Sequence, residues 1–98
     1  MFEPLDKLLN NPIRLIIMSV LMQVENSDFN YLKELTNSTQ GNLSIQIKKL
    51  SDAGYISVNK GFENNYPKTN CKITQKGKAA FETYFNAINS YRNNNINN

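Results

Sequence analysis

The 98-residue sequence has no histidine, no tryptophan and a single cysteine, Cys71. Without histidine and with one thiol, the chain cannot build a zinc site from Cys and His ligands, or a Ser-His-Asp triad. Its acidic residues are scattered, and none of their spacings indicates a pair of carboxylates for general acid–base catalysis. The sequence therefore predicts that the protein is not an enzyme, and it identifies no metal, no cofactor and no small-molecule effector.

Long apolar runs are also absent. The longest apolar stretch, residues 15–22, is interrupted by Ser19 and is far shorter than the ~20 residues that a membrane span needs. The first residues include Glu3 and Asp6, where a signal peptide would carry a basic region. We therefore expect a cytoplasmic protein without a membrane partner.

The surplus of positive charge is small. Eleven Lys and Arg residues against eight Asp and Glu residues give a net charge of +3, which by itself does not identify a nucleic-acid partner. A chain of this length forms one domain and buries only roughly 60–65% of its unfolded surface, so pairing with a second copy would add core. We expect this domain over residues 1–92 and a disordered, Asn-rich tail over residues 93–98.

Apolar residues spaced three and four apart predict several helices. The first is an amphipathic start, and the second begins at Asn11 and Pro12, a pair typical of a helix N-cap and first turn. Asp28 or Asn30 is expected to cap a short third helix, and Thr74 is expected to cap the last one. The predicted stretches are residues 2–9, 11–24, 31–35, 38–53 and 74–88.

Further along the chain, the apolar period changes from helical to two. Ile56 and Val58 alternate with polar residues, and so do Cys71 and Ile73, which predicts two strands. Because Cys71 shares a strand face with Ile73, we expect a buried apolar residue there and not a redox sensor. The polar segment 61–69 between the strands predicts a hairpin with a mobile tip.

Helix, helix, short turn, helix, hairpin and closing helix is the order of a winged helix-turn-helix domain. The fold class is therefore predicted to be mainly α with a small β-hairpin wing. In such a domain one helix enters the major groove of DNA, its partner braces it, and the hairpin reaches the neighbouring backbone or minor groove.

The helix predicted over residues 38–53 presents a polar face opposite its apolar stripe. Asp52 is the one acidic residue on that face. Amides and hydroxyls can hydrogen-bond base edges, Ile45 can contact a thymine methyl group, and lysines suit phosphates. The predicted DNA contacts on this recognition helix are Ser38, Thr39, Gln40, Asn42, Ser44, Ile45, Gln46, Lys48 and Lys49.

The hairpin over residues 60–72 is the predicted wing. Its predicted DNA contacts are Lys60, Asn65, Tyr66, Lys68 and Thr69. A polar helix face and strand lysines are also common on ordinary solvated surfaces, where lysines protect sheet edges. A separate alternative is a winged-helix module that presents its outer helix or wing to another protein, which an exposed Ile45 would also fit. The salt dependence of DNA binding separates this alternative from the DNA-binding hypothesis.

The spacing of these residues resembles small stand-alone winged helix regulators related to the MarR and ArsR groups, over about residues 5–84. The residues that carry the resemblance are Leu5, residues 11–14, Phe29, Leu32, Leu35, residues 41–50, residues 53–55, Lys60, Phe62, Glu63, residues 67–69, residues 73–74, Gly77 and Phe81. The resemblance implies a winged helix fold, double-stranded DNA as the partner, and a homodimer joined through its terminal helices. Where these regulators usually carry arginines before the wing proline, this chain has Asn65 and Tyr66, which implies a weaker grip on phosphate.

Apolar residues at the two ends of the chain exceed what so small a core is expected to absorb. The predicted dimerisation residues are Phe2, Leu5, Leu8, Leu9, Phe81, Phe85, Ile88 and Tyr91. The alternative is that the two terminal helices pack against each other within one chain. Together, these patterns predict a dimeric, sequence-specific DNA-binding transcriptional regulator that recognises an inverted repeat.

Overall fold

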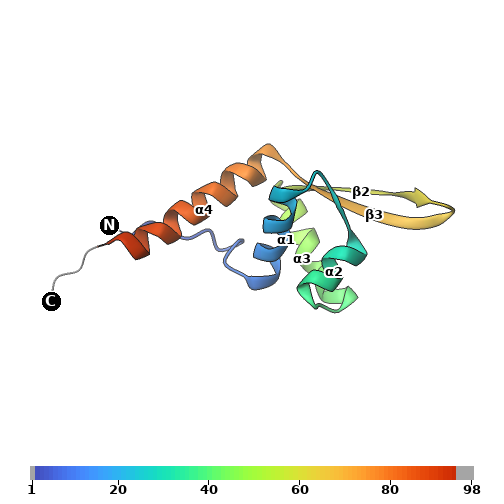
Figure 1. Ribbon diagram of the computed structural model, residues 1–98, viewed down its shortest axis with the longest axis horizontal. Helices are drawn as coiled ribbons and strands as arrows, with labels where there is room; N and C mark the ends of the chain where they lie inside the picture. The colour runs from blue at the N-terminus through green and yellow to red at the C-terminus, as the bar shows by residue number, and fades with distance from the viewer. Residues whose placement is uncertain (1, 95–98) are drawn as a thin grey trace.

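The computed structural model describes residues 2–94, and within them four helices and three strands follow one another as α1, β1, α2, α3, β2, β3 and α4 (Figure 1). The helices are α1 (Pro12–Gln23), α2 (Phe29–Thr36), α3 (Gln40–Asp52) and α4 (Gln75–Asn93), and the strands are β1 (Ser27–Asp28), β2 (Ile56–Glu63) and β3 (Tyr66–Ile73). This order confirms the predicted fold class, a mainly α domain with a β-hairpin wing.

Each helix begins at a polar side chain that accepts a hydrogen bond from a backbone amide of the first turn, which satisfies a donor that has no partner inside the helix. Asn11 does so for α1 at 3.0 Å, and Asp28 does so for α2 at 2.8 Å. Of the two residues predicted to cap α2, the cap is therefore Asp28 and not Asn30. Thr39 and Thr74 cap α3 and α4 in the same way.

The turn between α2 and α3 is made by the predicted break at residues 37–39. Asn37 has φ 52°, a left-handed conformation that asparagine tolerates better than most residues. Thr39 then caps α3, whose first residue is Gln40. Helix α3 therefore begins two residues later than the predicted start at Ser38.

The chain before α1 is not helical, so the prediction of a helix over residues 2–9 is wrong. Asp6 closes a local turn instead, because its side chain accepts a hydrogen bond from the Leu8 amide at 2.8 Å, and this competes with helix formation. The apolar spacing serves the core directly: Leu9 is fully buried, and Leu5 and Leu8 pack against the buried cluster.

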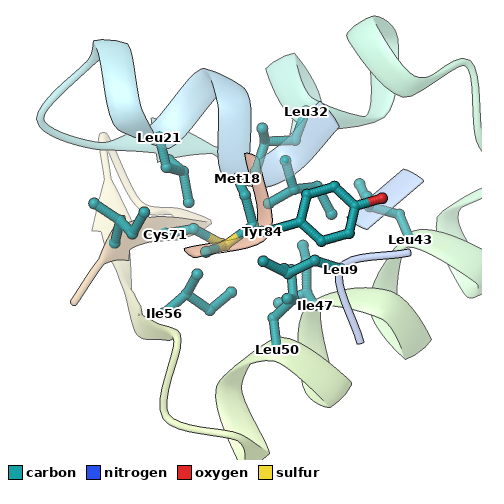
Figure 2. Close-up of a cluster of buried hydrophobic side chains, with 12 residues drawn as sticks. Leu9, Met18, Leu21, Leu32, Leu43, Ile47, Leu50, Ile56, Cys71 and Tyr84 are labelled. Carbon is teal, nitrogen blue, oxygen red and sulfur yellow. The ribbon is translucent and has the colours of Figure 1, made fainter. Parts of the chain in front are cut away.

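The core lies where α1, α2 and α3 meet the base of the hairpin (Figure 2). Its buried side chains are Leu9, Ile17, Met18, Leu21, Leu32, Leu43, Ile47, Leu50, Ile56, Cys71, Ile73 and Tyr84. Burying a leucine or isoleucine side chain stabilises the fold by roughly 1.5–3 kcal/mol. Because Leu43, Ile47 and Leu50 of α3 belong to this cluster, their burial holds α3 against the domain. Cys71 is a buried apolar residue, and burial raises the pKa of its thiol to about 11.

Strands β2 and β3 pair from Ile56 opposite Ile73 to Glu63 opposite Tyr66. The two residues between them, Asn64 and Asn65, both have positive φ, as a two-residue type I′ hairpin turn requires. The prediction of a hairpin over residues 61–69 is confirmed, and the turn at its tip is two residues long because the strands extend to Glu63 and begin again at Tyr66.

A third strand, β1, adds to the outer edge of β3, with Ser27 opposite Cys71 and Asp28 opposite Asn70. The sequence pattern did not predict this strand. Two residues are too few to display the alternation by which a strand is recognised.

The molecule is elongated, with principal extents of 63 × 26 × 21 Å. Figure 1 shows the wing projecting from one end and α4 from the other, with the N-terminal segment returning beside α4. Asn93 is the last residue of α4 and Asn94 is its C-cap, whereas residues 95–98 of the predicted tail lie outside the described part of the chain. None of the described helices has the length and apolar character that crossing a bilayer requires.

Candidate nucleic-acid interface

Helix α3 has one side in the core and the other at the surface. Its buried side carries Leu43, Ile47 and Leu50. Ile45 lies on the opposite side with 54% of its surface exposed, although it is a large apolar residue. The predicted contacts that the structure leaves exposed on this face are Thr39, Gln40, Asn42, Ser44, Ile45, Lys48 and Lys49.

Two of the predicted contacts are turned inward instead. Gln46 was expected on the flank of the outward face, but only 9% of its surface is exposed. Its side chain accepts a hydrogen bond from the Arg14 guanidinium and donates one to Asn42 Oδ1 at 3.0 Å. The expectation that Gln46 points outward is therefore wrong, because a buried amide needs partners and Arg14 on α1 supplies one.

Ser38 is the other inward residue. It is half-buried in the turn between α2 and α3, where its hydroxyl hydrogen-bonds the hydroxyl of Thr36. Thr36 in turn donates to the Leu32 carbonyl oxygen at 2.7 Å. Ser38 therefore belongs to the hydrogen-bonded turn between α2 and α3.

The lysines of α3 differ in their surroundings. Lys48 pairs with Asp52 one turn further on, at 3.0 Å between Nζ and Oδ2, and both side chains are exposed. Such an exposed pair contributes only about 0.3–0.5 kcal/mol, so a phosphate can displace the carboxylate at little cost. Lys49 makes no ion pair with any residue in the described part of the chain.

An open groove separates α3 from the wing. The residues that line it are Phe29, Gln40, Ser44, Ile47, Lys48, Ser51, Asp52, Val58, Lys60 and Thr69. The groove therefore brings together predicted contacts of the helix, such as Gln40 and Lys48, with Lys60 and Thr69 of the wing. A nucleic-acid backbone that enters this groove would meet hydroxyls, an amide and ammonium groups from both elements.

The wing holds one of its cations in an internal pair. Lys68 on β3 hydrogen-bonds Glu63 on β2 and lies 3.8 Å from Asp28 Oδ2. The hydrogen bond to Glu63 is the main cause of a raised pKa for Lys68. Lys60 has no such ion pair with any residue within residues 2–94, so no carboxylate competes for its ammonium group.

The outer part of the wing is unexpectedly apolar. Phe62 is 79% exposed and Tyr66 is 73% exposed, on either side of the turn at Asn64 and Asn65. Tyr66 and Asn65 were predicted contacts, whereas Phe62 was not among the candidate residues. The signal that would have identified Phe62 is an aromatic residue inside an otherwise polar hairpin.

The predicted dimerisation residues lie in the N-terminal segment and in α4, and they divide into two groups. Leu9 is fully buried and therefore cannot contact a second copy, which corrects that prediction. The others packed against the core are Leu5, Leu8, Phe81 and Ile88. The remaining three, Phe2, Phe85 and Tyr91, are exposed.

These exposed aromatic residues also contact other rings of the same chain. The Phe2 and Tyr91 ring centroids lie 5.0 Å apart, and those of Phe81 and Phe85 lie 4.8 Å apart. The N-terminal segment is held to α4 by Phe2 and by a hydrogen bond from the Glu3 amide to Ser90 Oγ at 3.1 Å. Packing within the chain, the alternative considered from the sequence, thus accounts for part of this apolar surface.

A second anchor joins the N-terminal segment to the domain. The Tyr55 hydroxyl donates a hydrogen bond to Asp6 Oδ2 at 2.5 Å, and burial followed by this hydrogen bond raises the pKa of Tyr55 to about 12. The Tyr84 hydroxyl of α4 donates to Asn10 Oδ1 at 3.0 Å.

An exposed helix beside a two-stranded wing, both resting on a small helical core, defines the winged helix class of proteins. The family comparison agrees with this geometry. The chain belongs to the winged helix DNA-binding domain family, whose model matches residues 13–91.

The chain is also similar to individual proteins in sequence or in structure. The chain is 40% identical over 82 residues to an uncharacterized protein of Methanocaldococcus jannaschii, a match that covers 84% of this chain and 89% of the relative. Its structure is similar to that of a transcriptional regulator homologue from Pyrococcus horikoshii OT3, with a TM-score of 0.79, 26% identity, and 87% and 84% of the two chains covered. It shares its fold with a MarR family transcriptional regulator from Silicibacter pomeroyi DSS, at a TM-score of 0.69 and 23% identity over 86% of this chain and 55% of that one.

Proposed function

We propose that this protein is a sequence-specific regulator of transcription that binds double-stranded DNA as a dimer, with α3 as the recognition helix and residues 60–72 as the wing. The observation that carries the proposal is the groove between α3 and the wing. Lys48 of α3 and Lys60 of β2 both line this groove. The similarity to the Pyrococcus transcriptional regulator homologue supports a regulatory role.

In this proposal α3 lies in the major groove. Its thirteen residues are about 20 Å long at 1.5 Å per residue, and an α-helix fits the width of that groove. Asn42 and Ser44 supply hydrogen-bonding groups for base edges, and Ile45 supplies an apolar contact for a thymine methyl group. Lys49 and Lys60 bind phosphates, and the aromatic wing tip lies against the neighbouring backbone or minor groove.

The dimer forms through the end of the molecule opposite the wing. Helix α4 and the N-terminal segment form that end (Figure 1), and Phe2, Phe85 and Tyr91 on these two segments are exposed. A two-fold axis at that end places two copies of α3 on the same side of a duplex, and half-sites one helical turn apart, about 34 Å, then form an inverted repeat.

The test is fluorescence anisotropy of a labelled duplex from the upstream region of the protein's own gene, at several salt concentrations. We expect the wild type to bind this duplex more tightly than a scrambled duplex, and we expect its affinity to fall as the salt concentration rises. The variant Lys48→Ala/Lys49→Ala should bind more weakly, and its log–log salt dependence should be shallower by up to about two, since each lost phosphate contact removes about one.

The matched control is Lys7→Ala/Lys78→Ala, which removes the same charge from exposed positions in the N-terminal segment and α4. Equal loss of affinity in both variants would mean that net charge alone drives binding. No binding of the wild type even at low salt would contradict the DNA-binding proposal.

A second candidate function is a winged helix that binds another protein. The exposed apolar side chains Ile45, Phe62 and Tyr66 favour it, because they lie on the two elements that would meet a partner. Absence of duplex binding together with salt-insensitive capture of a protein partner, abolished by Ile45→Asp, would support this function over the first.

A further inference from the structure

Three polar side chains form a continuous chain of hydrogen bonds from the N-terminal segment to the exposed face of α3. Arg14 Nε donates to the Leu8 carbonyl oxygen at 2.5 Å, and the Arg14 guanidinium also donates to Gln46 Oε1. Gln46 Nε2 then donates to Asn42 Oδ1 at 3.0 Å. Gln46 is buried, whereas Asn42 is exposed among the predicted base contacts.

Arg14 sets the direction of every hydrogen bond in this series of side chains. A guanidinium has N–H donors and no acceptor, so Gln46 must turn its carbonyl oxygen toward Arg14. The amide nitrogen of Gln46 then faces Asn42, and Asn42 must turn its own carbonyl oxygen toward Gln46. The outward group of Asn42 is consequently its amide nitrogen, Nδ2.

Reversal of Asn42 alone is unfavourable. It would place the Nδ2 donor of Asn42 against the Nε2 donor of Gln46 and leave a buried N–H without an acceptor. Reversal of both amides would place Gln46 Nε2 against the Arg14 guanidinium, which again sets donor against donor. Only one arrangement satisfies all three side chains.

We propose that Arg14 and Gln46 are positioning residues that make Asn42 a hydrogen-bond donor to DNA, so that it selects a base edge rich in acceptors, with guanine as the best match. This inference rests on the proposed function. A freely rotating asparagine pairs with adenine through one donor and one acceptor, whereas guanine offers the acceptors N7 and O6 in the major groove. With Oδ1 held by Gln46, the Nδ2 group of Asn42 matches guanine and not the adenine pattern.

The test reverses the donor and acceptor directions in this chain of hydrogen bonds. Gln46→Glu keeps the length of the side chain but removes its donor, so the carboxylate binds Arg14 and accepts a hydrogen bond from Asn42 Nδ2. Asn42 then presents Oδ1 outward, which matches the amino groups of adenine and cytosine. Base preference is read by selecting bound sequences from a duplex library randomised across the half-site.

Asn42→Ala identifies the base position that Asn42 reads, as the position where discrimination is lost. At that position we expect the wild type to prefer guanine by about tenfold, and Gln46→Glu to prefer adenine or cytosine, with the other positions unchanged. Gln46→Met removes the hydrogen bonds between Arg14 and Asn42 without reversing their direction, so it should weaken the preference for guanine. Arg14→Lys, which also supplies donors only, should retain the wild-type preference.

Thermal unfolding followed by circular dichroism shows which variants are folded, and Gln46→Met decides the question if Gln46→Glu does not fold. A wild-type preference for adenine or cytosine at the Asn42-dependent position would overturn the inference. So would an unchanged preference in folded Gln46→Glu or Gln46→Met, or the absence of any position that depends on Asn42. These outcomes leave DNA binding intact, whereas loss of all wild-type duplex binding would contradict the proposed function itself.

Discussion

At the scale of single residues, Gly77 marks the closest approach between α4 and the rest of the domain. A Cβ atom built at this position would overlap the Tyr55 carbonyl oxygen and lie 2.9 Å from Ile73 Cγ1. That carbonyl cannot move aside easily, because it accepts a hydrogen bond from the Thr74 amide at 3.0 Å. The side chain of residue 77 is thus limited by a backbone contact at the junction of wing and helix.

We therefore expect Gly77→Ala to lower the free energy of unfolding by about 1–3 kcal/mol, measured by urea denaturation. The matched control is Gly41→Ala in α3, where a Cβ meets nothing within 4 Å. Because alanine is the better helix former, this control should gain about 0.5–1 kcal/mol. Similar stability changes in the two variants would show that the contact at Gly77 is unimportant.

At the scale of elements, the wing is built from a regular hairpin whose charges partly cancel. Its two-residue turn at Asn64 and Asn65 keeps β2 and β3 in register out to Glu63 and Tyr66. The same register brings Lys68 close to Glu63. The ammonium group of Lys68, a predicted DNA contact, is therefore already paired with a carboxylate of the wing. We therefore expect the wing to bind phosphate more weakly than its number of lysines alone indicates.

Glu63→Gln should release Lys68 for phosphate binding. We expect severalfold tighter duplex binding and a log–log salt dependence that is steeper by up to about one. The control is Glu82→Gln, which makes the same change of charge at an exposed position on α4. If both variants gain the same affinity, the Glu63 carboxylate does not limit the wing.

At the scale of the whole molecule, the two ends have different surfaces. One end carries the wing and the exposed face of α3, and the other carries α4 with the N-terminal segment beside it (Figure 1). Phe85 and Tyr91 remain exposed at the second end despite their contacts with Phe81 and Phe2. This separation allows one end to associate with a second copy while the other binds DNA.

If the protein is the proposed dimer, sedimentation experiments should show a particle of twice the 11.2 kDa chain mass. Phe85→Glu/Tyr91→Glu should yield monomers, because it places carboxylates in an apolar interface. These monomers should bind an inverted repeat more weakly but retain affinity for a half-site. Tyr31→Glu/Leu35→Glu, on exposed apolar residues of α2, is the control and should remain dimeric. A monomeric wild type at assay concentrations would contradict the dimer.

Short-range rules were enough to predict most of the elements. Asn11 before Pro12 marks the start of α1, Thr74 caps α4, and the change to a period of two at Ile56 marks the hairpin. Each of these signals acts over a few neighbouring residues, so it can be recognised without knowing what lies across the core. The exposure of Ile45 followed in the same way, from helical geometry alone.

The tertiary structure decided the rest, because it brings together residues that are distant in the chain. Gln46 has a polar side chain near the outward face, but Arg14, 32 residues earlier, makes it a buried member of a hydrogen-bond chain. Residues 2–9 have helical spacing, yet the hydrogen bond between Asp6 and Tyr55, 49 residues apart, and the burial of Leu9 hold them as an irregular segment. A local pattern reports only the preferences of neighbouring residues, whereas burial and long-range hydrogen bonds depend on which surfaces meet when the chain folds.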